Sequence, residues 1–151
     1  MKQKSIFLVE DDTDDQNFFI EALSAIENTN VYGVANNGKE ALSMLKNSIS
    51  LPDHIFMDFN MPVMNGIECL IEMGKDPQTR DIPVVILSGS IEQAGPAAKL
   101  GAGFIRKSPE IEELRTQLHR IINLNITVNY VISDQTVSVK AGNSERSILR
   151  T

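Results

Sequence analysis

The sequence predicts an α/β fold, a doubly wound five-stranded parallel sheet with helices on both faces. Three observations support this prediction. Short, uninterrupted apolar runs recur along the chain, as is typical of strands that are buried on both faces of a sheet. Segments with helical periodicity lie between these runs, which is the alternation of βαβ units. Acidic or other polar residues directly follow several of the runs, at the sheet edge where such folds hold their ligands.

The strand candidates are the five apolar runs themselves. Each is followed by a helical segment, so right-handed crossovers can place helices on both faces of one sheet. The runs span Ile6–Val9, Val31–Ala35, Ile55–Met57, Val84–Leu87 and Gly103–Ile105.

The first helix is predicted to begin at Thr13, which can form a capping box with Gln16. Four apolar residues that follow share one helical face and are expected to reach the core. They are Phe19, Ala22, Leu23 and Ile26.

Three further helices follow turn or cap signals. In the helix after Asn65-Gly66 the apolar face leaves Cys69 to one side, so this cysteine is expected to be an inert thiol. The last helix is predicted to have Ser108 as its N-cap and Pro109 as its first residue. The predicted core residues are Ala41, Leu42 and Leu45 in the second helix, Ile67, Leu70 and Ile71 in the third, and Ile111, Leu114, Leu118 and Ile121 in the last.

The composition is that of an ordinary globular protein. The 151 residues are 42% hydrophobic and carry a formal net charge of −6, which argues against a nucleic-acid-binding surface. The first residues show neither a signal peptide nor a membrane span, so no membrane association is expected. A single cysteine excludes an internal disulfide and is consistent with a reducing cytoplasm, where we expect the protein to be located.

The pattern divides the chain into a main domain, residues 1–124, and a C-terminal tail, residues 125–151. In the tail, apolar and polar residues alternate over 126–132 and again over 136–140, which predicts a short hairpin. An isolated hairpin is marginally stable in water. The tail therefore packs on the domain, pairs with a second copy to form a homodimer, or stays disordered.

Polar side chains at the ends of the predicted strands form one constellation. Glu10 and Asp11 follow the first strand, Asp58 the third, Ser88 the fourth and Lys107 the fifth. Carboxylates that converge at one sheet edge repel one another, so one of them must lose its charge or a cation must join them. Mg²⁺ is the simplest candidate, because it prefers oxygen ligands and retains some of its waters.

These residues and their neighbours resemble a response regulator receiver domain of two-component signalling, of the stand-alone type. The resemblance extends from about Ser5 to about Asn123 and implies a flavodoxin-like receiver fold. It rests on four segments in the expected order, each at its own strand end. They read Leu8-Val9-Glu10-Asp11-Asp12, Met57-Asp58-Phe59-Asn60-Met61-Pro62-Val63-Met64-Asn65-Gly66, Ile86-Leu87-Ser88-Gly89 and Phe104-Ile105-Arg106-Lys107.

The resemblance implies that Asp58 accepts a phosphoryl group from a histidine kinase or a phosphotransfer protein. Asp11 and Asp58 then bind Mg²⁺ directly with the backbone carbonyl of Asn60, and Glu10 binds it largely through water. Lys107 pairs with one phosphoryl oxygen and the Ser88 hydroxyl donates to another. Gly89 presents no side chain that obstructs the entering group.

The same resemblance describes a switch rather than an enzyme that acts on a separate substrate. In the family the hydroxyl at the position of Ser88 moves toward the phosphoryl group, and the aromatic residue at the position of Phe104 turns inward behind it. The affinity for a downstream protein partner changes as a result. Phe104 has no hydroxyl, so packing alone must drive its movement, and its alternative role is that of a core aromatic residue.

The sequence departs from the family pattern at two places. Lys107 is followed by Ser108 and not directly by proline, so either a cis bond at Lys107–Ser108 is stabilised by the site or the loop differs. The segment between Ser88 and Lys107 is about one helical turn shorter than usual and contains Gly95-Pro96. Because proline is tolerated at a helix start but not in its interior, a short or displaced fourth helix is expected.

Other interpretations stay open beside this one. Asp12, Asp14 and Asp15 are interpreted as solvated residues of a helix N-terminus, which the helix dipole favours. The chain could be a constitutive binding module that has the same fold but does not use phosphate. An aspartate-nucleophile phosphohydrolase is disfavoured, because such enzymes need a second acid two residues after the nucleophile and this chain has Asn60 there.

Overall fold

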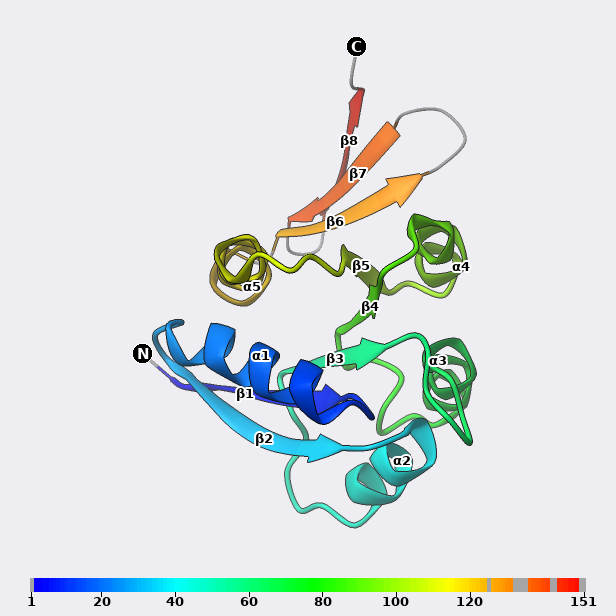
Figure 1. Cartoon of the computed structure of the whole chain (residues 1–151). Helices are drawn as coiled ribbons and strands as arrows, with labels where there is room; N and C mark the ends of the chain where they lie inside the picture. The colour runs from blue at the N-terminus through cyan, green and yellow to red at the C-terminus, as the bar shows by residue number, and fades with distance from the viewer. Residues whose placement is uncertain (1, 125, 132–135, 142–143, 150–151) are drawn as a thin grey trace.

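The computed structural model describes residues 2–124 together with 126–131, 136–141 and 144–149, the last three segments as backbone only. The main part is a single parallel sheet with the strand order β2-β1-β3-β4-β5 (Figure 1). The predicted fold class is therefore confirmed. Within the described residues, no helix is both long and apolar enough to cross a membrane.

Each of the five strands of this sheet contains one of the five predicted apolar runs and extends it by one or two residues. They are β1 Lys4–Val9, β2 Thr29–Ala35, β3 His54–Asp58, β4 Val84–Ser88 and β5 Gly103–Arg106. The helices between and after them are α1 Thr13–Ser24, α2 Gly38–Lys46, α3 Gly66–Lys75, the 3₁₀ turn η1 Ile91–Gln93, α4 Ala94–Lys99 and α5 Ile111–Leu124.

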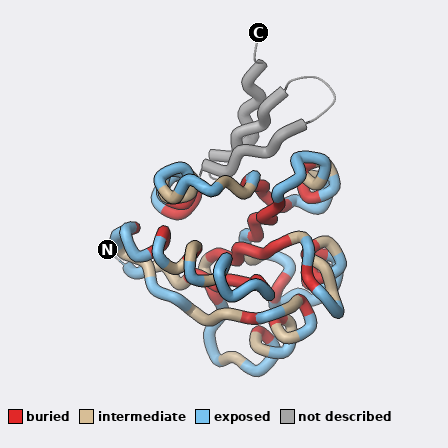
Figure 2. The backbone as a smooth tube through the Cα atoms, in the orientation of Figure 1, coloured by how far each residue is buried: buried red, intermediate tan, exposed pale blue. Residues whose placement is uncertain are grey.

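The core has two layers, one on each face of the sheet. Successive strand residues point to opposite faces, and in β1 both sets are apolar and buried, with Ile6 and Leu8 on one face and Phe7 and Val9 on the other. Helices α1 and α5 cover the first face, and α2, α3 and α4 cover the second. Figure 2 shows the resulting band of buried residues along the strands. Burial on both faces explains why the strands are continuously apolar.

Helix α1 buries the predicted face of Phe19, Ala22 and Leu23, but its predicted cap is wrong. The N-cap is Asp12, whose side chain accepts a hydrogen bond from the Asp15 backbone N–H at 2.9 Å. Gln16 does not close a capping box with Thr13. Its amide donates to the Glu10 carbonyl oxygen at 2.6 Å instead and ties the first turn of α1 to the end of β1.

Helix α3 packs with Ile67 and Leu70 of the predicted face, but Cys69 takes the place of Ile71 in the core. Cys69 is fully buried in the core, whereas Ile71 is 43% exposed. The reason is the close approach of α2, because a Cβ atom at Gly38 would lie 2.8 Å from the Cys69 Cβ. Burial raises the pKa of the Cys69 thiol to about 12. The expectation of an unreactive thiol therefore agrees with the structure, although its predicted location does not.

The region from β4 to α5 contains the two departures from the family pattern. Helix α4 is short, as predicted, and Pro96 lies in its first turn, where a backbone N–H needs no partner within the helix. The Lys107–Ser108 peptide bond is trans. Helix α5 begins at Ile111, later than predicted, because Ser108 caps no helix and its hydroxyl instead accepts the Glu110 backbone N–H at 3.1 Å.

In the described part of the tail there are three strands, β6 Ile126–Val131, β7 Thr136–Ala141 and β8 Ser144–Leu149. They form an antiparallel sheet in the order β6-β7-β8. Strands β6 and β7 correspond to the predicted hairpin, and β8 was not predicted. The predicted turn at residues 133–135 lies outside the described residues.

The loop between β3 and α3 contains a strained turn at Val63. Its φ is 70°, and the Met64 backbone N–H donates to the Pro62 carbonyl oxygen at 2.8 Å. A hydrogen bond between residues two apart around a centre of positive φ is the γ-turn geometry that is rare and strained. For a β-branched residue this conformation is a clear outlier. The Val63 side chain is 76% exposed, so little packing offsets the strain.

Replacing Val63 by Gly is expected to raise the free energy of unfolding by about 0.5–1 kcal/mol, because relief of the strain exceeds the added entropy of the unfolded chain. Urea denaturation measures the change. Asn28→Gly is the matched control, since Asn28 has a φ of 61° but belongs to a residue type that tolerates this region. Equal effects of the two substitutions, or destabilisation by Val63→Gly, would contradict the assignment of strain.

His54 is a buried polar residue at the start of β3, at the opposite end of this strand from Asp58. Burial, together with the charge of Lys4, lowers the pKa of its imidazole to about 4 against the opposing effect of Asp53. Its Nδ1 atom has no hydrogen-bond partner among the described residues. The folded protein therefore holds His54 in its neutral form.

This burial predicts a pH-dependent stability. The unfolded state binds a proton at His54 below about pH 6.5, but the folded state does so only below about pH 4, so stability is lost as the pH falls through this window. Between pH 7.5 and pH 5 the loss is about 2 kcal/mol. Urea denaturation of wild type and His54→Leu at both pH values measures the part of the stability loss that is due to His54.

His54→Leu should remove this loss from the total pH dependence, while His119→Gln, which changes an exposed histidine of α5, should leave it in place. An unchanged pH dependence in His54→Leu would refute the assignment.

Candidate functional site

Three carboxylates meet at the carboxyl edge of the sheet. Oxygen atoms of Glu10, Asp11 and Asp58 all lie within 4.8 Å of one another, close enough for one metal ion to bind to all three. Glu10 is only 1% exposed and Asp58 only 5%, while Asp11 lies at the surface. The predicted convergence of these carboxylates is therefore confirmed.

The strand geometry explains why these side chains meet. Phe56 packs on the face covered by α1 and α5, and Asp58, two residues later, points to the same side. Glu10 follows Leu8 and Lys107 follows Ile105 in the same way. Close packing of α3 also fixes the backbone of Asp58, since a Cβ atom at Gly66 would lie 2.6 Å from the Asp58 carbonyl oxygen.

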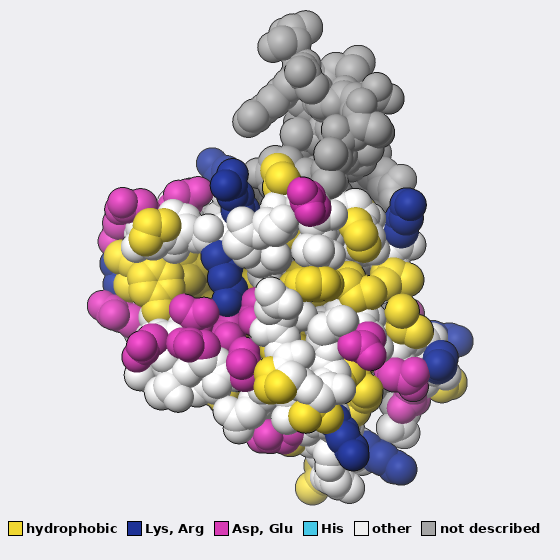
Figure 3. Space-filling view, turned by 45° about the vertical axis from the view of Figure 1, so that its right-hand side comes forward, with side chains coloured by type: hydrophobic (Ala, Val, Ile, Leu, Met, Phe, Trp, Pro, Cys, Tyr) yellow, Lys and Arg dark blue, Asp and Glu magenta, His cyan; other side chains and the backbone are white. Residues whose placement is uncertain are grey.

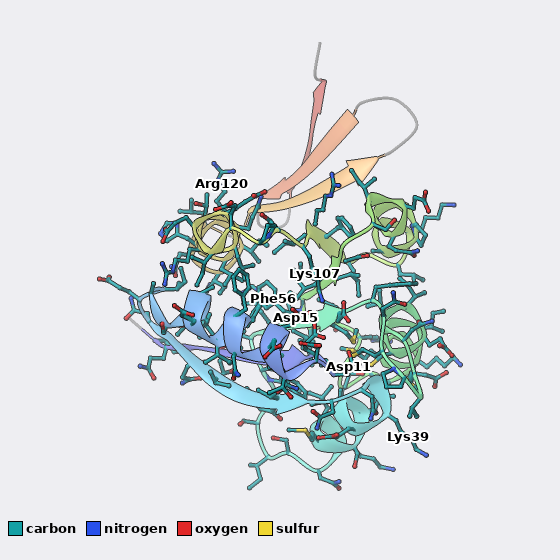
Figure 4. All side chains as sticks on the ribbon, in the orientation of Figure 1. Asp11, Asp15, Lys39, Phe56, Lys107 and Arg120 are labelled. Carbon is teal, nitrogen blue, oxygen red and sulfur yellow. The ribbon has the colours of Figure 1, made fainter. Side chains whose placement is uncertain are left out.

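Lys107 is the cation at the centre of this site. Its Nζ atom lies 3.1 Å from Glu10 Oε2, 3.1 Å from Asp58 Oδ1 and 2.9 Å from Asp15 Oδ2. Figure 4 shows Lys107 extending from the end of β5 toward Asp15 and Asp11. The Lys107 backbone N–H donates to the Ser88 carbonyl oxygen at 2.8 Å, which holds the segment after β5 beside the end of β4.

Burial dominates the electrostatics of the acidic residues. Burial, together with the charge of Asp58, raises the pKa of Glu10 to about 7 against the opposing effect of Lys107. Burial also raises the pKa of Asp58, against the effect of Lys107. Burial lowers the pKa of Lys107, but its hydrogen bond to Asp15 and the charges of Asp58 and Glu10 outweigh burial and hold the pKa above its ordinary value. One ammonium group thus compensates only part of the negative charge.

The remaining predicted residues surround this cluster. Ser88 is buried at the end of β4, and its Oγ accepts the Ser90 backbone N–H at 3.1 Å, so the hydroxyl proton stays available for donation. Phe104 is 3% exposed, in the core layer of α2–α4. Asn60 is exposed in the loop after β3. A Cβ atom at Gly89 would meet no atom within 4 Å.

A cavity of about 70 Å³ adjoins the cluster between α1 and α5. Glu10, Asp15 and Lys107 line its polar side, and Phe18 and Leu114 contribute to its apolar walls. Figure 3 shows this side of the molecule, where acidic side chains gather next to a hydrophobic area and a basic side chain. The cavity therefore reaches Glu10, Asp15 and Lys107 of the cluster.

Asp15 is the residue that the sequence interpretation missed. As predicted for a helix N-terminus, Asp15 lies in the first turn of α1 with its side chain 50% exposed. The short distance to Lys107 was not expected. The available signal was helical geometry, because Asp15 lies three residues after the N-cap Asp12, and the first turn starts directly beside Glu10.

Comparisons with known proteins agree with this arrangement. The model of the family described as response regulator receiver domain matches residues 6–119. The nitrate/nitrite response regulator protein NarL of Escherichia coli K12 is 34% identical over 101 residues, which are 66% of this chain and 46% of that protein. A protein-glutamate methylesterase/protein-glutamine glutaminase of Clostridium acetobutylicum is 36% identical over 95 residues, which are 63% of this chain and 26% of that protein. The chain thus spans between about a quarter and a half of the length of these relatives.

Solved structures show the same fold over most of the chain. The phosphorylated cyanobacterial phytochrome response regulator RcpA superposes with a TM-score of 0.72 and 31% identity, covering 83% of this chain and 97% of that one. The chemotaxis response regulator CheY4 of Vibrio cholerae gives a TM-score of 0.69 and 25% identity, covering 80% and 100%. The site geometry, the family match and these structures lead to one conclusion: the chain belongs to the response regulator receiver domain family.

Proposed function

We propose that this protein is a phosphorylatable response regulator that accepts a phosphoryl group on Asp58 in a Mg²⁺-dependent reaction. The observation that carries the proposal is the pairing of Asp58 Oδ1 with Lys107 Nζ at 3.1 Å, beside two further carboxylates at the edge of the sheet. A carboxylate is a competent nucleophile toward phosphorus once the negative charges around it are neutralised.

The residues present fit a magnesium ion. Glu10, Asp11 and Asp58 offer hard oxygen ligands, and the raised pKa values of Glu10 and Asp58 reflect buried negative charge that Lys107 alone does not balance. Asp11 and Asp58 are proposed as direct ligands, with the Asn60 carbonyl oxygen, and Glu10 as a ligand through water. When bound, Mg²⁺ supplies positive charge that offsets the repulsion between the carboxylates and the incoming phosphoryl oxygens.

The protein's own groups direct the transfer. A carboxylate oxygen of Asp58 attacks phosphorus and forms a P–O bond as the P–N bond of a phosphohistidine donor breaks, and the freed imidazole nitrogen keeps the electron pair and takes a proton. Lys107 donates to one oxygen of the transferred group, and the Ser88 hydroxyl donates to another. Gly89 has no side chain that would obstruct the incoming phosphoryl group.

The added charge at Asp58 works as a switch. Ser88 moves toward the phosphoryl group, and Phe104, behind it in the core, repacks and changes the surface that binds a downstream protein. A histidine kinase or a phosphotransfer protein is the proposed donor. The chain promotes its own phosphorylation and dephosphorylation and acts on no separate substrate. Residues 1–124 form the receiver and 125–151 an appended segment.

The relatives support this proposal. RcpA, at 31% identity, has been observed in phosphorylated form, and NarL is a response regulator for nitrate and nitrite. The chain has a carboxylate, a hydroxyl and a lysine at the ends of β3 and β4 and directly after β5. All three groups required for the proposed reaction are therefore contained in this chain.

Incubation with acetyl phosphate and Mg²⁺ is expected to add one phosphoryl group per chain, detected by intact mass. Asp58→Asn should abolish the adduct, because the amide cannot act as the nucleophile, and a chelator should abolish it in wild type. Asp81→Asn is the matched control, since its carboxylate is 90% exposed and pairs only distantly with Arg80.

Peptide mapping of the adduct locates the modified residue. An adduct at another residue, or one that persists in Asp58→Asn, would refute Asp58 as the acceptor. A folded wild type that binds Mg²⁺ but forms no adduct with acetyl phosphate or a phosphorylated donor would favour a constitutive binding module instead.

A further inference from the structure

The first turn of α1 contributes a carboxylate that lies outside the proposed metal-binding set but contacts the site lysine. Asp15 Oδ2 is 2.9 Å from Lys107 Nζ, the shortest of the three distances from this nitrogen to a carboxylate. Its side chain is 50% exposed, so Lys107 bridges the buried carboxylates and a carboxylate at the surface.

We propose that Asp15 is a positioning residue for phosphoryl transfer, which holds the ammonium group of Lys107 over Asp58. This inference rests on the proposed function and deepens it, because it names a determinant of the reaction rate. Among the described residues, Asp15 forms no hydrogen bond with Asp58, Glu10 or Asp11. Its charge also raises the pKa of Asp58 directly, but removing a negative charge beside Asp58 would ease the approach of an anionic donor and would not slow the reaction. A slower reaction in a variant that lacks this carboxylate must therefore come through Lys107.

The number of donors on Lys107 supports this role. An ammonium group has three N–H donors, and three carboxylates surround it here. Two of these, Glu10 and Asp58, belong to the proposed metal-binding set, and Asp58 also receives the phosphoryl group. Asp15 is the partner that neither the metal ion nor the phosphoryl group requires. It is thus the group that can keep Lys107 in place throughout the reaction.

The position of Asp15 is itself well defined. Its backbone N–H donates to the Asp12 side chain at 2.9 Å, which fixes the first turn of α1. The Gln16 side chain connects the same turn to the Glu10 carbonyl oxygen at 2.6 Å. Asp15 is therefore anchored, through Asp12 and Gln16, to the strand end that carries the site. A lysine has a flexible four-carbon stem, so an anchor of this kind limits the conformations that its ammonium group can adopt.

The neighbouring Asp14 provides a matched control. It belongs to the same first turn and is exposed, but it forms none of the ion pairs found among the described residues. Asp14→Ala and Asp15→Ala remove the same charge from the same helix. A general electrostatic effect on an anionic phosphate donor should appear in both variants, whereas loss of positioning should appear only in Asp15→Ala.

The experiment measures phosphorylation of Asp58 by acetyl phosphate at saturating Mg²⁺. We expect Asp15→Ala to lower the maximal rate constant about tenfold without a matching change in the half-saturating acetyl phosphate concentration. Asp14→Ala should stay within about twofold of wild type, and Asp15→Glu, which restores the carboxylate, should recover most of the rate. Thermal melting checks that the variants are folded.

A second readout does not depend on turnover. Binding of beryllofluoride in the presence of Mg²⁺ tests whether Lys107 is placed to contact a bound phosphoryl analogue. Asp15→Ala should weaken this binding about tenfold relative to Asp14→Ala. The affinity for Mg²⁺ alone should be similar in the two variants, since Asp15 is not a proposed ligand.

The outcomes separate the two proposals. If wild type is phosphorylated at Asp58 and the Asp15 and Asp14 variants behave alike, the positioning role is refuted and the proposed function stands. A faster reaction in Asp15→Ala, or the absence of rescue by Asp15→Glu, would also refute it. If wild type takes no phosphoryl group at Asp58, the proposed function fails and the positioning role fails with it.

Discussion

The burial of Glu10 and Asp58 next to each other is the constraint on which the rest of the site depends. Removing two carboxylates from water costs free energy unless positive charge joins them. Lys107 supplies part of that charge at 3.1 Å from each. Because the lysine follows β5 and the carboxylates follow β1 and end β3, the compensation exists only once all three strands are assembled. The assembled sheet therefore holds the site together at a cost in stability, and the residual negative charge favours a cation.

The helices around the sheet hold this arrangement in place. On one side, Gln16 and the N-cap Asp12 join the first turn of α1 to the end of β1, which brings Asp15 within reach of Lys107. On the other side, Gly66 lets the N-terminus of α3 approach the backbone of Asp58 more closely than any side chain would permit. Close packing and short hydrogen bonds thus restrict the positions of the charged groups. Such restriction is what a reaction that depends on placement and electrostatics requires.

The departures from the family pattern lie in the region after Ser88. Helix α4 is short and starts with Pro96 in its first turn, and α5 begins only at Ile111. The carboxylates and Lys107 are nevertheless together, since the pairing of β4 with β5 is regular up to Arg106. The site at the carboxyl edge of the sheet therefore tolerates variation in α4 and α5. The consequence of this variation falls on the surface formed by α4 and its neighbours.

Local patterns in the sequence were sufficient for most of the fold. The five apolar runs predicted the five strands of the parallel sheet, and the polar residues directly after them predicted the convergence of Glu10, Asp11 and Asp58. These predictions succeed because burial on both faces selects continuous apolar residues, and because parallel strands end at a common edge. The short fourth helix was also predictable, since Pro96 restricts the backbone locally.

Other features depended on contacts between segments distant in the chain. Asp12 rather than Thr13 caps α1, and Cys69 rather than Ile71 faces the core, because α2 and the end of β1 decide how each helix is rotated and where it starts. Asp15 contacts a lysine 92 residues away, and no local pattern encodes that distance. The sequence by itself determined which residue types stand at the strand ends and in which order. Only the tertiary structure decided which of several nearby acids contact Lys107, because helix rotation and side-chain reach are set by packing and not by spacing along the chain.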